Sequence, residues 1–248
     1  MHPNTIYVLI IIFLATLVRS TFGFGESLVG VPLLLFFMSI ETAVPLCVLL
    51  STFIAMVLLF RNQTKVQFNS AKWLIIFAVL GVPIGLFGLI YLNETIVKVG
   101  LGGLIVAYSV YSLISTSIFK LKADNMFWLF ICGFFSGIFG GAYGLNGPPI
   151  VVYGDMRSWT PSHFRATLQA YFLPLGIVGL LGYWFHGILS MQVFQYFLMS
   201  LPVVLMAIYF GDYLHSKIKE GAFLKYVHIG LLAIGVLLLS HAFKIEII

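Results

Sequence analysis

Residues 22–32 have the sequence FGFGESLVGVP, and 117 positions later residues 139–149 have the sequence FGGAYGLNGPP. Five of the eleven aligned positions are identical, namely Phe, Gly, Leu, Gly and Pro. Both segments interrupt a long apolar run with glycine and proline, which end or break helices. The match indicates an internal repeat. It predicts two homologous transmembrane repeats, residues 1–120 and 121–248, within a single membrane domain.

The composition of the 248-residue chain indicates a membrane protein. Apolar residues make up 61% and charged residues 8% of the sequence, whereas a soluble domain has about 25% charged residues. The mean hydropathy is +1.08. A folded chain with so few polar residues would not stay soluble in water. The predicted class is therefore an all-α integral membrane protein. This excludes soluble enzymes, nucleic-acid-binding proteins and disulfide-rich secreted domains.

Eight apolar runs follow one another, at residues 6–39, 42–60, 73–92, 95–118, 126–154, 163–185, 190–213 and 222–243. Six of them have the length that crosses a bilayer once as a helix. The other two, 6–39 and 126–154, would be about 50 Å and about 43 Å long as single helices. Each either folds back as a helical hairpin or crosses as a tilted, broken helix, which gives about 8 to 10 crossings.

The basic residues discriminate between these two arrangements. If every run crosses once, the basic residues divide evenly, six on each side. If both long runs are hairpins and the N-terminus is outside, ten lie inside, and only Lys98 and Lys244 lie outside. The positive-inside rule favours the hairpins. Each half then crosses an odd number of times, so the second repeat is inverted, an architecture typical of secondary transporters. Parallel repeats of four spans each are the alternative.

The residues at the two breaks predict a site for an anion. Glycines at a break inside the membrane leave backbone N–H groups without helical partners, and these can bind an anion together with the positive ends of short helices. The same glycines could instead allow close helix packing. The predicted substrate-binding residues are Arg19, Gly23, Phe24, Gly25, Glu26, Ser27, Tyr143, Gly144, Asn146, Gly147, Arg165 and Gln169.

Arg19 lies in an apolar run, four residues before Gly23. A buried guanidinium needs a partner or a ligand, and its planar fork suits an oxyanion. It could instead pair with Glu26 or extend to the membrane surface. Glu26 is either that counter-ion or a proton carrier, because a carboxylate in a medium of low dielectric constant can be neutral.

Further polar side chains lie at or after the second break. Tyr143, Asn146 and Gln169 could each donate to an oxyanion, although Asn146 also suits a purely structural turn. Arg165 is either close to this turn or a cytoplasmic anchor. The sequence has no Ser-His-Asp order, no clustered His/Cys spacing and no Walker loop. We therefore predict no catalytic residues, metal site or cofactor, and no enzyme activity.

Three segments resemble the signatures of the sulfite exporter TauE/SafE family. Residues 23–34 (GFGESLVGVPLL) are similar to its first signature, and residues 135–151, with GLNGPPIV at their end, to its second. Residues 164–172 (FRATLQAYF) also fit the second half. The resemblance covers the entire chain and implies a multi-pass plasma-membrane (inner membrane) transporter of sulfite, organosulfonates and related small anions. Many members have further glycines where this chain has Glu26 and Ser27.

The predicted function is a secondary transporter or facilitator of small sulfur-containing anions such as sulfite, taurine or sulfoacetate. The substrate is expected between the two broken segments near the midplane, with the halves rocking around it. The alternative is a passive channel for a small anion. The predicted partners are the anionic substrate and the lipid bilayer, with no nucleic acid. A coupling proton or sodium ion and a homodimer stay open.

Overall fold

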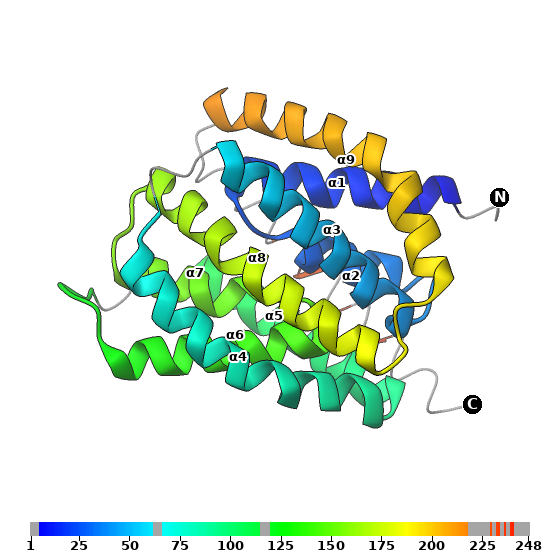
Figure 1. Cartoon of the computed structure of the whole chain (residues 1–248), viewed down its shortest axis with the longest axis horizontal. Coiled ribbons are helices and arrows are strands. Elements are labelled where there is room, and N and C mark those ends of the chain that lie inside the picture. The colour runs from blue at the N-terminus through cyan, green and yellow to red at the C-terminus, as the bar shows by residue number, and fades with distance from the viewer. Residues whose placement is uncertain are drawn as a thin grey trace.

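The computed structural model describes residues 5–61, 66–114 and 120–217, and six single residues between positions 229 and 240. The described segments are helical and contain no strand, as predicted (Figure 1). The apolar run 222–243 and Lys244 lie outside the continuous ranges. The helices are α1 (Thr5–Phe22), α2 (Glu26–Leu34), α3 (Ile40–Arg61), α4 (Phe68–Tyr91), α5 (Glu94–Ile114), α6 (Met126–Tyr143), α7 (Gly147–Met156), α8 (Pro161–Phe185) and α9 (Met191–Lys217).

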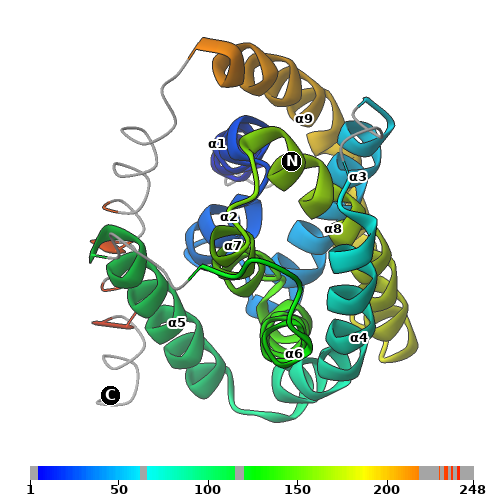
Figure 2. The ribbon, with the colours of Figure 1, turned by 90° about the vertical axis from the view of Figure 1, so that its left-hand side faces the viewer.

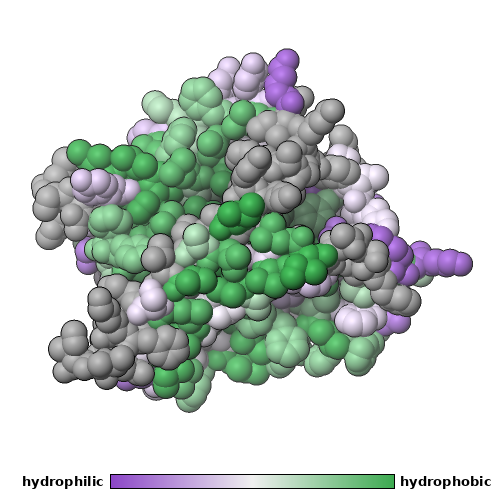
Figure 3. All heavy atoms as spheres, turned by 180° about the vertical axis from the view of Figure 1, so that it is seen from behind, coloured by the Kyte–Doolittle hydropathy of each residue, from purple (hydrophilic) through white to green (hydrophobic). Residues whose placement is uncertain are grey.

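Seven of the described helices are long and apolar enough to cross a membrane, namely α1, α3, α4, α5, α6, α8 and α9. The other two, α2 and α7, have 9 and 10 residues. Large apolar side chains such as Phe60 and Phe185 are more than 70% exposed. Figure 3 shows apolar side chains over much of one face, with the most hydrophilic residues toward its edges. Such a surface suits lipid, which confirms the predicted multi-pass membrane protein.

The first long apolar run folds back as a hairpin formed by α1 and α2. The ring of Tyr7, near the start of α1, stacks on Phe37, just beyond α2, with centroids 5.5 Å apart. At the other end, Arg19 in the last turn of α1 contacts Glu26 in the first turn of α2. The start of α1 is therefore next to the end of α2, and the end of α1 is next to the start of α2, so the two helices are antiparallel. Gly23 (φ 89°) and Gly25 (φ 99°) make the turn in a left-handed conformation that a side chain disfavours.

The second long run forms a hairpin from α6 and α7. The Leu121 N–H, ahead of α6, donates to Met156 O at the end of α7 at 2.8 Å. At the tip, the Ser136 hydroxyl donates to Asn146 O. Gly144 ends α6 with φ 69°, and its N–H donates to Gly140 O at 2.9 Å. The sequence allowed each long run to be either a hairpin or a tilted, broken helix. In the structure, both long runs are hairpins. That the hairpins are related by a repeat stays a prediction.

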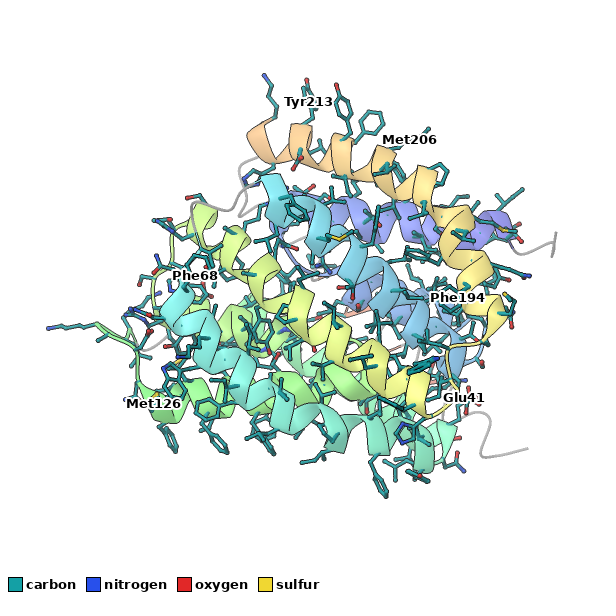
Figure 4. All side chains as sticks on the ribbon, in the orientation of Figure 1. Glu41, Phe68, Met126, Phe194, Met206 and Tyr213 are labelled. Carbon is teal, nitrogen blue, oxygen red and sulfur yellow. The ribbon has the colours of Figure 1, made fainter. Side chains whose placement is uncertain are left out.

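The two hairpins open at opposite ends of the molecule. Figure 4 places Glu41, which follows the first hairpin, at one end with Phe194 of α9. It places Met126, which begins the second hairpin, at the other end with Phe68 of α4. The described lysines next to Phe68 and Met126 in sequence, Lys72, Lys120 and Lys122, belong to this second end. By the positive-inside rule we expect this end to be cytoplasmic, and this orientation stays a prediction.

The closest helix packing joins the two predicted halves to each other. A Cβ atom added to Gly85 in α4 would lie 2.0 Å from Ile138 O in α6, so these two backbones are in contact. A Cβ on Gly211 in α9 would lie 2.4 Å from the Cβ of Ser20 in α1. Figure 2 shows α1 beside α9 and α4 beside α6. The two predicted halves, residues 1–120 and 121–248, are therefore packed tightly against each other. They could not move apart as rigid bodies without breaking the contacts of α4 with α6 and of α1 with α9.

Candidate functional site

The two hairpin tips meet at one small cavity. Residues from both tips, from α3 and from α8 line it: Arg19, Gly25, Glu26, Ser27, Leu28, Ser51, Gly144, Leu145, Asn146, Gly147, Pro148 and Phe172. Seven of these are among the twelve residues predicted from the sequence. A Cβ on Gly144 would lie 3.4 Å from Ser27 Oγ, and one on Gly147 would lie 3.6 Å from Phe24 Cδ2. The two tips are therefore close to each other, with Gly144 near Ser27 and Gly147 near Phe24.

The cavity is narrow. About 20 Å³ is accessible to the centre of a water molecule, which is room for about one or two waters. A sulfite or sulfonate group has at least four heavy atoms and needs more room than one or two waters occupy. The cavity would therefore have to widen before such an anion could fit.

The short helices α2 and α7 both begin at this cavity. Gly25 precedes α2 and Asn146 precedes α7, and neither helix has a side chain that caps its first N–H groups. These N–H groups carry the positive end of the helix dipole. Pro148 and Pro149 have no N–H, so α7 offers fewer donors than α2. The donors at the cavity belong mostly to α2.

Arg19 is held by side chains from three other helices. Its Nη1 donates to Glu26 Oε2 at 2.9 Å and also to the hydroxyl of Ser51 in α3. Its Nη2 donates to Gln169 Oε1 in α8 at 3.0 Å. The guanidinium carbon lies 4.9 Å from the centre of the Phe172 ring, a cation–π contact. Arg19 and Glu26 are each 2% exposed, so this ion pair is removed from solvent.

Unpaired polar atoms remain at the cavity. Within the described residues, Arg19 Nε, Glu26 Oε1 and Asn146 Oδ1 are buried and have no hydrogen-bond partner. A buried polar atom without a partner costs roughly 1–3 kcal/mol, and such atoms are uncommon in folded proteins. One unused donor and two unused acceptors therefore belong to residues that line the cavity, although Asn146 Oδ1 itself lies against Gly140 of α6.

The remaining predicted residues surround the cavity. Gln169 Nε2 donates to Gly23 O at 2.7 Å, so Gln169 connects Arg19 to the first tip. Gly23 packs against Arg165, where a Cβ would lie 2.9 Å from Arg165 Cγ. Phe24 contacts Gly147 and makes an edge-to-face contact with Phe164.

Arg165 and Tyr143 point elsewhere. Arg165 Nη2 donates to Ser20 O and forms an ion pair with Asp212 in α9, so it fastens the end of α1 to α8 and α9. The Tyr143 hydroxyl lies against Gly100 in α5, where a Cβ would be 2.3 Å away. Neither side chain lines the cavity.

Three interactions could not be anticipated from the sequence. Ser51 is one of three hydroxyl residues in the apolar run 42–60, and Phe172 is one of 24 phenylalanines, so nothing marks either as a partner of Arg19. Asp212 lies 47 positions from Arg165. In the ranges that the structure covers, no group of three His, Cys, Asp or Glu residues could hold a metal ion.

Comparison with known proteins gives one finding. The family model described as sulfite exporter TauE/SafE matches residues 8–238, nearly the whole chain. No curated protein matches the chain, and no solved structure does.

Proposed function

The chain belongs to the sulfite exporter TauE/SafE family, and from this premise we propose that it is a secondary transporter or facilitator that binds a small sulfur-containing anion between its two hairpin tips. The family is one of membrane transporters, and its description gives the class of substrate. Sulfite and sulfonates such as taurine and sulfoacetate are the substrates that we propose for this chain.

The observation that carries the proposal is the buried guanidinium of Arg19 beside the uncapped start of α2. A charged side chain within a membrane is costly and usually has a functional role. The Nε atom of Arg19 is an unused donor, and the first N–H groups of α2 provide more. A planar fork and converging N–H groups are suited to the oxygens of a sulfite or sulfonate group.

Movement of the tips is the second part of the proposal. The cavity in this conformation is too small for the anion, so transport requires the tips to separate. Because the hairpins open at opposite ends, displacement of each would expose the site to a different side, as alternating access requires. The moving bodies would each contain helices from both halves, because α1 packs on α9 and α4 packs on α6.

Counterflow in proteoliposomes tests the proposal. Vesicles loaded with unlabelled sulfite or taurine are expected to take up the labelled anion with saturation. Arg19→Lys keeps the charge but loses the planar fork, so exchange is expected to fall about tenfold or more. Arg157→Lys is the matched control, because Arg157 pairs with Asp124 away from the cavity.

Two results would contradict the proposal. Equal rates of exchange by the wild type and Arg19→Lys would show that Arg19 does not bind the anion, which would contradict the proposed site. Flux that neither saturates nor exchanges would indicate the passive anion channel instead.

A further inference from the structure

The carboxylate of Glu26 occupies one of the Arg19 donors that an anion could use. Its Oε2 accepts from Arg19 Nη1 at 2.9 Å, while its Oε1 is buried and has no partner within the described part of the chain. Glu26 is the first residue of α2 and lines the cavity. In this conformation the protein's own carboxylate therefore takes the place of a bound anion.

The charge of the cavity decides what can bind there. Arg19 and Glu26 together are neutral when both are ionised. An added monoanion would give a net charge of −1 in a buried space, which is strongly unfavourable. If Glu26 takes up a proton, Arg19 and the anion balance each other and the site is neutral again. A protonated Glu26 without an anion would leave Arg19 unbalanced. Only the empty ionised state and the state with both proton and anion are neutral.

The other groups around Glu26 do not change this balance. Arg19 is the charged residue that faces it from α1. From α3 it is faced by the Ser51 hydroxyl, and the Cys47 thiol, one turn earlier in α3, packs on Gly30. Asn146 from α7 is neutral. Among the described residues, the ion pair of Arg165 with the partly exposed Asp212 is outside the cavity lining.

We propose that Glu26 is a proton-binding site that couples the anion to a proton, both bound on one side of the membrane and released together on the other. The proton binds the carboxylate, the contact between Glu26 Oε2 and Arg19 Nη1 opens, and an anion oxygen takes over that donor. On release, the proton goes to water and the ion pair forms again. For a monoanion such as an alkanesulfonate the cycle moves no net charge. This inference rests on the proposed function.

Binding of methanesulfonate tests the coupling, because this anion keeps one negative charge across the range that proteins tolerate. Calorimetry of the purified wild type in two buffers of different ionisation enthalpy is expected to show uptake of about one proton per anion bound. Above the pH at which Glu26 titrates, the apparent Kd is expected to rise about tenfold per pH unit. Glu26→Gln is expected to take up no proton and to have a Kd that does not depend on pH.

Transport provides a second measurement. In proteoliposomes, an inward proton gradient is expected to drive accumulation of methanesulfonate by the wild type and by Glu41→Gln, a control at an exposed position outside the cavity. Glu26→Gln is expected to lose accumulation driven by the gradient. Glu26→Asp, which keeps a carboxylate, is expected to retain coupling.

The outcomes separate this inference from the function on which it rests. Saturable anion exchange with no proton uptake by the wild type would overturn the coupling and leave the transporter intact. Accumulation by Glu26→Gln in response to a proton gradient would do the same. If the wild type neither binds nor exchanges sulfite or a sulfonate, the proposed function fails and the coupling fails with it. Proton uptake is measured on the wild type, so the coupling can be tested even if Glu26→Gln does not fold.

Discussion

Adding one methyl group to Gly137 tests the contact between α4 and α6. A Cβ at this position would lie 2.0 Å from Ala78 O and 2.9 Å from Ala78 Cα. Ordinary contact begins at 3.4 Å, so Gly137→Ala must move the two helices apart by roughly 1.4 Å at this point. The obstacle is backbone, which cannot rotate away as a flexible side chain can. We therefore expect Gly137→Ala to destabilise the protein.

The size of the loss follows from two opposing terms. Overpacking costs about 1–3 kcal/mol, and the rigid backbone contact favours the upper end of this range. Alanine in place of glycine in a helix interior returns about 1 kcal/mol. The expected net loss is about 2 kcal/mol. Gly103→Ala in α5 is the matched control, because a Cβ there has no atom within 4 Å; it is expected to be neutral or to gain up to about 1 kcal/mol.

Thermal unfolding in detergent, followed by tryptophan fluorescence, measures the difference. For a chain of this size, about 2 kcal/mol corresponds to a decrease in Tm of roughly 4–8 °C. The Tm of Gly103→Ala is expected to stay the same or to rise. Equal Tm values for the two variants would show that α4 and α6 are not in backbone contact, and the reasoning would then be wrong.

Three other predictions concern the ends of the helices. Asp124 accepts from Ser70, Tyr153 and Arg157 at the base of the second hairpin, so Asp124→Asn is expected to lower stability by about 1–3 kcal/mol in thermal unfolding; unchanged hydrogen exchange at this base would contradict it. A double-mutant cycle of Arg165→Met and Asp212→Asn is expected to give a coupling of about 1–3 kcal/mol, whereas additive losses would mean that the pair does not form. A membrane-impermeant maleimide is expected to label Glu41→Cys in intact cells but Phe68→Cys only after permeabilisation, with little background because Cys47 and Cys132 are buried; labelling of both from one side would refute the orientation.

The hairpins could be predicted because local chemistry determines them. Glycine is the residue that most readily adopts the positive φ angles found at Gly23, Gly25 and Gly144. The lengths of the two apolar runs and the distribution of lysine and arginine favoured the fold-back before any contact was known. The residues that meet at the tips followed from these turns, which is why Arg19, Glu26 and Asn146 were found together.

The partners of these residues could not be predicted in the same way. In lipid, apolar side chains do not distinguish a neighbouring helix from the bilayer, so hydrophobic pattern does not decide which helices pack together. The pairing of Arg19 with Ser51 and Phe172 is a consequence of how α3 and α8 pack. A signal for the contact between α4 and α6 was present, because Gly133, Gly137 and Gly141 recur every four residues, as do Gly81 and Gly85 in α4. This spacing indicates close packing, but it does not identify the partner.

The contact between α1 and α9 has a consequence for biosynthesis. The Thr21 hydroxyl reaches Gly211 O across 190 positions of sequence. At translation rates of about 5–20 residues per second, the ribosome needs roughly 10–40 s to make the chain between them. Throughout that interval the α1 surface that includes Ser20 and Thr21, both buried in the finished protein and in contact with Gly211, is without its cover inside the membrane. A nascent chain that stalls before α9 would present these hydroxyls to lipid or to an insertase, and it would be a target for membrane proteases.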